Sequence, residues 1–244
     1  MSNDENTISH IEAALYLFPV PLSTGTAESV LPMANTGILR QVKHFIVENI
    51  RSARRFLKLC DRSIDIDSLT FVELNRHTPP QAVPAMLDPL ARGEAVGVIS
   101  EAGCPAVADP GADVVAVAQQ RGFKVVPLVG PSSILMSLMG SGFNGQSFAF
   151  NGYLPIDRDA RSKTLRMMQS RITSERQTQI FIETPYRNNK LIAELAATLP
   201  AGMLLCVASD ITGPAQSILT RPISYWKHAR YDYDKIPTIF LLFS

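Results

Sequence analysis

Cysteine is scarce in this chain, and its placement excludes two common roles. The three cysteines, Cys60, Cys104 and Cys206, lie far apart, and no two of them form a CxxC pair. Neither a zinc site nor a disulfide framework is therefore indicated, and we expect no bound metal. A lone Cys104 in a loop is most simply a small loop residue, since nothing in the sequence around it indicates a reactive thiol.

The chain also lacks a large net charge and any segment that would carry it to a membrane. The formal net charge is only +1, so no global positive field attracts nucleic acid, and RNA binding would need a local patch. The polar start MSNDENTISH is no signal peptide, and no apolar run reaches spanning length. We therefore expect a cytoplasmic protein with no membrane partner.

Several fingerprints of nucleotide and hydrolytic chemistry are absent. The first predicted strand-to-helix loop reads PVPLSTGTAE instead of GxGxxG, which counts against a dinucleotide site. GxxxxGK[ST], HExxH and GxSxG do not occur either. Phosphoryl transfer by a P-loop, zinc hydrolysis and a serine nucleophile thus have little support.

What the chain does have is an alternation of apolar strands and helices. With 46% hydrophobic residues, its 244 residues suffice for one large or two small domains. Strands alternating with helices predict a parallel sheet up to the glycine-rich SGFNGQ at 141–146, after which the pattern restarts. We predict two α/β domains, at 15–143 with a parallel sheet and 144–244 with a mixed sheet, after a disordered tail at 1–14.

The predicted elements are placed by apolar runs, prolines and glycines. Strands are expected at 15–20, 45–48, 71–74, 95–100, 124–129, 148–152, 179–183, 204–209 and 238–243. Helices are expected at 51–60, from Pro79 to about Arg92, from Asp109-Pro110-Gly111 to Gly122, from Pro131 to at least Met139, and at 158–170 and 188–199.

The stretch 98–133 contains the two most informative loops. SEAGCP, from Ser100 to Pro105, and GPSS, from Gly130 to Ser133, each follow a predicted parallel strand. Glycine lets a ligand approach the backbone, and a helix start presents free N–H groups to a carboxylate or phosphate. The alternatives are an ordinary strand-to-helix connection and helix capping. Two such loops in consecutive units favour a shared binding cleft.

Other candidate residues have plain structural explanations beside the functional ones. Glu48 and Arg51 follow a strand end and either face the cleft or form a solvated pair. His77 in a polar loop is either a general base or an exposed histidine without a role. The cations Arg158, Arg161, Lys163 and Arg166 line one helix, as a phosphate-facing patch or as a solvated face.

Five motifs in order resemble those of one family. LYLFPVP, VISEAGCPAVADPG, KVVPLVGPSS, FNGYLP and IFIETPYR resemble the tetrapyrrole-methylase superfamily, the class III S-adenosylmethionine-dependent methyltransferases. The similarity is greatest to the branch that methylates a cytidine 2′-O in small-subunit ribosomal RNA. It extends from about Leu15 to the C-terminus. The ordered set is specific, whereas each motif alone is weak.

The resemblance implies two α/β domains with S-adenosylmethionine in the cleft between them, usually in a homodimer. The apolar residues Val98, Ile99 and Leu128 suit the walls of such a cleft. The positions that match the cofactor motifs, or lie beside them, are Pro19, Pro21, Ser100, Glu101, Ala102, Gly103, Cys104, Pro105, Gly130, Pro131, Ser132, Ser133, Gly152, Tyr153, Leu154, Pro155, Glu183, Pro185 and Arg187.

The departures from the rRNA branch gather on the expected acceptor side. EDTR becomes Glu48-Asn49-Ile50-Arg51, and the HExHN-like segment becomes Asn75-Arg76-His77-Thr78. SDAGTP becomes SEAGCP, and the first loop differs as well. The chain ends at FLLFS, without the C-terminal extension of longer relatives.

Three functions follow as hypotheses. The leading one is methyl transfer to ribosomal RNA or the small ribosomal subunit, with Glu48, Arg51, His77 and Glu101 on the acceptor side and Glu101 or His77 as the base. The second changes the acceptor to a tetrapyrrole or another small molecule. The third is a non-catalytic S-adenosylmethionine-binding protein.

Overall fold

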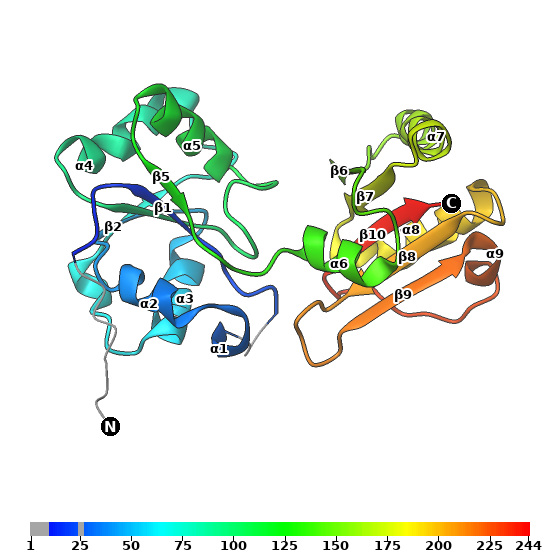
Figure 1. Ribbon diagram of the computed structural model, residues 1–244, viewed down its shortest axis with the longest axis horizontal. Coiled ribbons are helices and arrows are strands. Elements are labelled where there is room, and N and C mark those ends of the chain that lie inside the picture. The colour runs from blue at the N-terminus through cyan, green and yellow to red at the C-terminus, as the bar shows by residue number, and fades with distance from the viewer. Residues whose placement is uncertain (1–9, 24–26) are drawn as a thin grey trace. The chain divides into compact units, whose positions relative to one another are not determined.

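Two compact units make up the chain, Met1–Pro131 and Ser132–Ser244. The computed structural model, shown in Figure 1, describes residues 10–23 and 27–244. Each unit contains one five-stranded sheet. None of the helices in these described ranges is both long and apolar enough to cross a membrane.

The sheet of the first unit is parallel and has the strand order β3-β2-β4-β1-β5. Its central strands are buried apolar runs, as expected for a parallel sheet covered on both faces. The strands are β1 (Leu15–Phe18), β2 (His44–Val47), β3 (Thr70–Glu73), β4 (Val96–Ile99) and β5 (Val125–Pro127).

Helices cover both faces of this sheet, because some of the connections between its strands pass over one face and the others pass over the opposite face. Figure 1 shows α2 and α3 on one face and α4 and α5 on the other. Leu39 and Phe56 belong to the first core layer, and Leu90 and Val114 to the second. The helices are α1 (Ala27–Val30), α2 (Met33–Leu39), α3 (Ile50–Cys60), η1 (Ile66–Ser68), η2 (Pro80–Leu87), α4 (Asp88–Ala91) and α5 (Gly111–Gln120).

One predicted helix differs in type. The segment from Pro79 to Arg92 is a 3₁₀ stretch, η2, followed by the short α4. Pro84 lies inside η2, where it lacks the N–H of a regular helix and its ring crowds the preceding turn. The expectation of one continuous α-helix was therefore wrong.

The second unit has a mixed sheet of order β6-β7-β10-β8-β9. Only β6 and β7 pair in parallel, and the other three pairings are antiparallel. The strands are β6 (Phe148–Tyr153), β7 (Thr178–Ile182), β8 (Leu204–Ser209), β9 (Ser217–Pro222) and β10 (Thr238–Phe243). The helices are α6 (Ser133–Ser141), α7 (Arg158–Glu175), η3 (Pro185–Arg187), α8 (Asn188–Thr198) and α9 (Ile223–Trp226).

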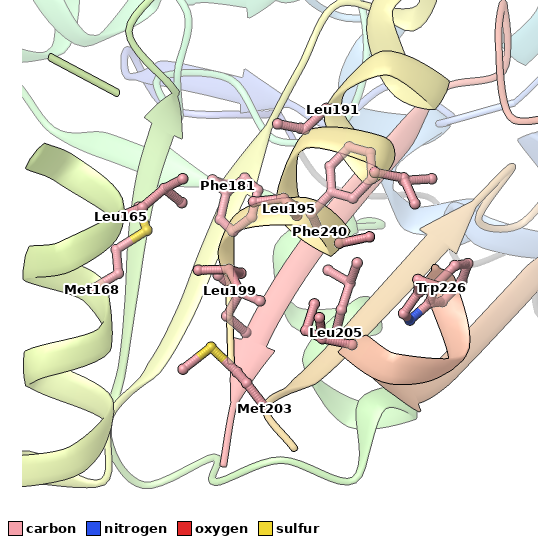
Figure 2. Close-up of a cluster of buried hydrophobic side chains, with 14 of the residues drawn as sticks. Leu165, Met168, Phe181, Leu191, Leu195, Leu199, Met203, Leu205, Trp226 and Phe240 are labelled. Carbon is pink, nitrogen blue, oxygen red and sulfur yellow. The ribbon is translucent and has the colours of Figure 1, made fainter. Parts of the chain in front are cut away.

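The core of the second unit is built around the central strand β10. All six residues of β10 are buried, and Phe240 stacks on Phe181 of β7 with ring centroids 5.8 Å apart. Figure 2 shows these rings among Leu195 of α8, Leu205 of β8 and Trp226 of α9. Helices α7 and α8 are thus anchored on the sheet by apolar contacts.

The division between the units lies at the start of α6, whereas the sequence pattern places it after this helix, at 143/144. Helix α6 packs on β9 and β10. Gly140 lies so close to Ile218 that a Cβ there would be 2.6 Å from its Cδ1, and the Thr220 hydroxyl donates to Ser141 O at 2.8 Å. These contacts assign α6 to the second unit.

The predicted tail at 1–14 is described only from residue 10. Residues 1–9 lie outside the described residues. Ala14 is fully buried, and the Ile11 N–H donates to Gln41 Oε1 at 3.1 Å. The last residues of this segment are therefore part of the first unit.

Candidate active site

The predicted site residues of the first unit lie at the carboxyl edge of its parallel sheet. Pro19 follows β1, Ser100 follows β4, and Gly130 follows β5. The neighbouring strands β4 and β1 send the chain to helices on opposite faces of the sheet. Loops that part in this way are where open α/β sheets bind ligands.

Direct contacts join the three loops. Val20 and Gly103 exchange two backbone hydrogen bonds of 2.9 Å, which form an isolated antiparallel bridge. Gly130 packs against Pro19, so closely that a Cβ on the glycine would be 2.2 Å from the proline Cβ. The Cys104 thiol donates to Pro131 O at 3.5 Å. The three loops therefore form one continuous surface, in which backbone atoms make most of the contacts between loops.

Cys104 takes part in this surface as a structural residue. Burial raises the pKa of its thiol, which keeps the sulfur protonated at neutral pH. The family's threonine at this position also has a donor group on its Cβ. The departure from SDAGTP to SEAGCP at Cys104 thus retains a donor for Pro131 O.

The central loop has an unusual backbone that an acidic side chain stabilises. Gly103, Ala106 and Ala108 all have positive φ, at 70°, 67° and 59°. Both Asp109 carboxylate oxygens accept from Ala106 N at 3.0 Å, and Oδ1 also accepts from Gly111 N at 2.6 Å. Left-handed alanines persist only where such contacts over-determine the chain. The sequence placed Asp109 at the start of a predicted helix, and this role in the loop was missed.

Part of the central loop is open to solvent. Glu101 and Ala102 are exposed, whereas Ser100, Gly103 and Pro105 are buried. The backbone at 101–102 is therefore accessible to a ligand, beside a glycine whose lack of a Cβ permits close approach.

Three carboxyl groups gather beside this loop. Burial raises the pKa of Glu48, and the negative charges of Glu101 and Asp109 raise it further. A hydrogen bond from the Glu101 backbone to Glu48 acts in the opposite direction. A pocket of about 10 Å³, which is water-sized, lies between Glu48, Ser100 and Asp109. The structure thus brings Glu48 and Glu101 together.

The changed residue of the EDTR-like segment keeps a structural role. Asn49 is the N-cap of α3, and its Oδ1 accepts from Ser52 N at 3.1 Å. Asparagine and aspartate are about equally good N-caps, so this substitution retains the cap. The Ser52 hydroxyl in turn donates to Glu101 Oε2 at 3.0 Å, so Glu101 already has a partner.

His77 and Arg51 are exposed, and no hydrogen bond described here joins either of them to Glu48, Glu101 or Asp109. The Arg76 Nε donates to His77 Nε2 at 3.2 Å, and the His77 N–H donates to Asn75 Oδ1 at 2.9 Å. The contacts of His77 thus stay within its own loop. Arg51 lies on the first turn of α3, beside a groove described below.

The GPSS loop continues into the second unit, where its serine is a cap. Ser132 is the N-cap of α6, and its hydroxyl accepts from Leu135 N at 3.4 Å. Helix capping is thus present, although the first-turn amides still favour an anion.

In the second unit, the remaining predicted residues lie in the last two positions of the strand β6 or follow the parallel strands β6 and β7. Gly152 has φ +65°, beside an irregular register between Phe150 and Tyr153. Glu183 is buried, accepts from Thr184 N at 2.7 Å and pairs with Arg187 at 3.0 Å. Pro185 O accepts from Lys235 N at 2.8 Å. Gly152 and Glu183 thus flank one edge of this sheet.

Sequence similarity connects this chain to named methyltransferases. No family model matches the chain. "Ribosomal RNA small subunit methyltransferase I" of Vibrio cholerae is 29% identical over 221 residues, covering 91% of this chain and 73% of the relative. Its namesake from Pasteurella multocida is 32% identical over 149 residues, covering 61% and 52%. That from Escherichia coli O157:H7 is 27% identical, covering 87% and 70%.

Solved structures show the same fold. The methyltransferase CobJ has a TM-score of 0.63 at 15% identity, covering 95% of this chain and 94% of that one. Uroporphyrin-III-C-methyltransferase from Thermus thermophilus has a TM-score of 0.52 at 15% identity, covering 95% and 92%. The chain thus resembles ribosomal RNA small subunit methyltransferases in sequence and has the fold of tetrapyrrole methyltransferases. The predicted fold class and enzyme class, a methyltransferase, are confirmed.

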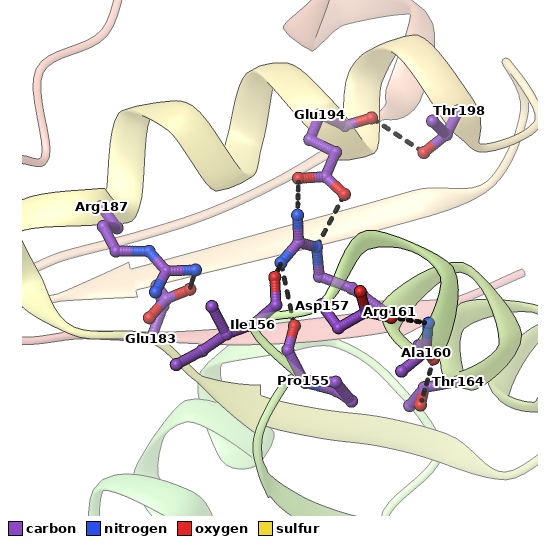
Figure 3. Close-up of polar contacts among 10 residues, drawn as sticks. All are labelled: Pro155, Ile156, Asp157, Ala160, Arg161, Thr164, Glu183, Arg187, Glu194 and Thr198. Carbon is purple, nitrogen blue, oxygen red and sulfur yellow. Dashed lines mark hydrogen bonds and ion pairs between the residues drawn. The ribbon is translucent and has the colours of Figure 1, made fainter.

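One charged residue of this methyltransferase has a different role from the one considered in the sequence. Arg161 is buried, and Figure 3 shows its guanidinium bound to both Glu194 oxygens, at 2.7 and 2.8 Å. It also donates to Pro155 O and Ile156 O, which follow Gly152. Arg161 therefore does not belong to a phosphate-facing patch. Its position on the same helical face as Leu165 and Met168 was a signal that sequence reasoning missed.

The methyltransferase shows no metal centre in its described part. Within residues 10–23 and 27–244, no group of three histidine, cysteine or acidic residues has metal-binding geometry.

Proposed function

We propose that this methyltransferase uses S-adenosylmethionine to methylate ribosomal RNA at a ribose 2′-hydroxyl. The observation that carries the proposal is the Val20–Gly103 bridge, which joins two family-like loops at the carboxyl ends of β1 and β4. The printed names of the sequence relatives support RNA as the acceptor. A protein of this function would work in the cytoplasm, and we propose a homodimer.

The residues present fit the proposed cofactor. At Gly103, a Cβ would meet Leu22 Cδ2 at 3.2 Å and Pro131 O at 3.8 Å, so only glycine leaves this surface open. Accessible backbone at 101–102 suits a sulfonium and its polarised methyl, and the α6 amides suit a carboxylate. When bound, S-adenosylmethionine supplies a methyl group whose leaving group is a neutral thioether.

The residues proposed to hold the cofactor are those that match the family's motifs, and they are given for each unit by itself. In the first unit they are Pro19, Pro21, Ser100, Glu101, Ala102, Gly103, Cys104, Pro105, Gly130 and Pro131. In the second unit they are Ser132, Ser133, Gly152, Glu183 and Pro185. The chain's contribution to rate is chiefly alignment, because the contacts among the loops fix their backbone atoms before any ligand arrives.

Glu48 is the best-placed proton acceptor for a ribose hydroxyl. Burial and two neighbouring carboxyl groups raise its pKa, which moves it toward the range in which a carboxylate is an effective base. Glu48 accepts a hydrogen bond from the Glu101 backbone, whereas Glu101 Oε2 and His77 Nε2 accept hydrogen bonds from the side chains of Ser52 and Arg76. In the proposed reaction the Glu48 carboxylate takes the hydroxyl proton, and Glu101 keeps Glu48 basic by its charge.

Two measurements test the proposal. Calorimetric titration of the full chain with S-adenosylmethionine and S-adenosylhomocysteine should show binding of both. Transfer of tritiated methyl to small ribosomal subunits from a strain lacking this gene should then label one ribose, identified by mass spectrometry of digested RNA. Absence of binding at about millimolar cofactor would overturn the proposal.

The acceptor is decided in the same assay. Subunits from the wild-type strain should take up little label, because their site is already methylated. A tetrapyrrole panel serves as the comparison, and it should remain unlabelled. Labelling of a tetrapyrrole but not of ribosomal subunits would assign the enzyme to a small-molecule acceptor instead.

A further inference from the structure

Helix α3 carries an uninterrupted row of positive charge. Arg51, Arg54, Arg55 and Lys58 are all exposed and lie on one side of the helix, three, four and seven residues after the first. No carboxylate occurs between Ile50 and Cys60. The row is a local feature, since the whole chain has a net charge of only +1.

The row lines a groove. The hollow has a volume of about 580 Å³, and the aliphatic side chains of Ile50 and Ile66 complete its walls. Because α3 rises about 1.5 Å per residue, the row from Arg51 to Lys58 extends for about 10 Å. That length matches a few nucleotides of a single strand.

Neutral groups, rather than carboxylates, hold three of these cations in place. The Arg54 guanidinium lies over the Phe71 ring at 5.5 Å, and Arg55 donates to the Ser52 hydroxyl at 3.3 Å. Lys58 donates to Arg62 O and Ile64 O at 2.9 and 2.7 Å. Among the described residues, none of the four cations belongs to an ion pair. Their charges are thus ordered but not neutralised.

This pattern distinguishes the α3 row from an ordinary solvated helix face. The other cationic helix, α7, has Asp157 as its N-cap and Asp159 in its first turn, and its Arg161 is neutralised by Glu194. Cations held by neutral partners lose less side-chain entropy when an anion binds. They also offer the repeated positive charge that a phosphate backbone needs.

The groove begins beside the proposed catalytic group. Glu48 directly precedes Asn49, the N-cap of α3, and Ser52 on the first turn donates to Glu101. A strand bound along α3 would therefore reach the carboxyl edge of the sheet at Glu48. We propose that the α3 groove binds the phosphate backbone of the acceptor RNA beside the methylated nucleotide. The proposal rests on the proposed function, which makes RNA the acceptor.

The test is a salt titration of RNA binding by the full chain. A fluorescently labelled single strand of about 12 nucleotides is titrated with protein over a series of potassium chloride concentrations. The test variant combines Arg54→Gln, Arg55→Gln and Lys58→Gln. The control combines Arg158→Gln, Lys163→Gln and Arg166→Gln, which removes three exposed charges from α7.

We expect the α3 variant to lose about two units of the slope of log K against log salt, since each phosphate contact contributes about 0.7. Its affinity at low salt should fall at least about tenfold, and the α7 control should stay within about twofold of the wild type. Equal losses in both variants, an unchanged slope in the α3 variant, or no RNA binding by the wild type would each overturn the groove.

Further readouts separate this proposal from the proposed function. The α3 variant should bind S-adenosylmethionine normally and show a raised KM for ribosomal subunits with kcat retained. The single variant Arg55→Gln provides the answer if the triple variant fails to fold, with an expected slope loss of about 0.7. If the wild type transfers methyl groups and the α3 variant has unchanged RNA affinity and KM, the proposed RNA-binding role of the groove is wrong and the proposed function stands. If α3 binds RNA but the wild type transfers no methyl group, the proposed function is wrong and the RNA-binding role of the groove stands.

Discussion

Val20 and Gly103 bond to each other in both directions, N–H to C=O, at 2.9 Å each. These residues follow β1 and β4, which are parallel, so the antiparallel bridge requires one of the two loops to reverse its direction after it leaves the sheet. The bridge ties the position of one loop to that of the other. A change at Gly103 should therefore affect both cofactor loops.

Replacing Gly103 with alanine should strain the central loop. Its φ of +70° costs an L-residue about 1–2 kcal/mol, and the added Cβ would lie 3.2 Å from Leu22 Cδ2. We expect Gly103→Ala to lower the melting temperature by several degrees and to weaken S-adenosylmethionine binding at least about tenfold. Thermal unfolding and calorimetric titration measure the two effects.

Gly122→Ala is the matched control. Gly122 has φ +71°, follows α5, and has no atom within 4 Å of its would-be Cβ. Gly122→Ala should lower the melting temperature about as much as Gly103→Ala does, without any change in the affinity for S-adenosylmethionine. If both variants bind S-adenosylmethionine equally well, Gly103 has no special place in the cofactor site.

Gly130→Ala should be more damaging than Gly103→Ala. The added Cβ would overlap the rigid Pro19 ring, at 2.2 and 2.7 Å from its Cβ and Cγ, so the first and third loops must separate. Overpacking of this kind costs about 1–3 kcal/mol. Denaturant unfolding should show that loss, with cofactor binding reduced. Gly145→Ala, which meets nothing within 4 Å, should leave both unchanged.

Much of the fold was predictable because apolar runs and turn residues determine it locally. The strands β8 and β10 have the predicted bounds, since each is a continuous buried run. Strand β9 was missed because it is a half-exposed edge strand without a clear apolar run. The assignment of α6 to the second unit also depends on a contact between residues far apart in the sequence, Gly140 and Ile218, which no sequence pattern reveals.

The site was predictable only in part. The family-like loops identified Gly103 and Gly130, whose spacing from the strands places them at the carboxyl edge. The sequence offered Glu101 or His77 as the base. The choice of Glu48 in their place stays a proposal, which rests on the carboxyl groups around Glu48 and on the side chains bonded to Glu101 and His77. That information comes from the positions of Ser52 and Arg76 side chains, which composition and spacing do not determine.

Glu48→Gln should abolish most of the methyl transfer while leaving the cofactor site intact. Loss of a general base costs about 10²–10⁴-fold in rate, and the amide keeps the size of the side chain. Single-turnover transfer to ribosomal subunits should fall by that factor, with S-adenosylmethionine affinity within about threefold. Larger losses for Glu101→Gln or His77→Ala than for Glu48→Gln would assign the base elsewhere.

The raised pKa of Glu48 also predicts a pH-dependent gain in stability for Glu48→Gln. Between the ordinary glutamate value of 4.5 and the higher folded value, the native state binds more protons than the unfolded state. Stability therefore falls as pH rises through that window, and the charged form carries the cost above it. The variant should melt at a higher temperature than the wild type at neutral pH and at the same temperature below pH 4.5. A lower melting temperature at neutral pH would contradict the raised pKa.

Arg161→Ala tests the contact that holds the loop after Gly152. Arg161 is 8% exposed, and its guanidinium bonds to Glu194, Pro155 O and Ile156 O, so its loss leaves a partly buried carboxylate and two carbonyls unpaired. We expect a loss of about 3 kcal/mol in denaturant unfolding, with weaker cofactor binding. Arg166→Ala, on the exposed side of α7, should change stability by less than about 0.5 kcal/mol. Arg161→Lys should rescue little, because an ammonium cannot bond to Glu194 and both carbonyls in the fork geometry of arginine.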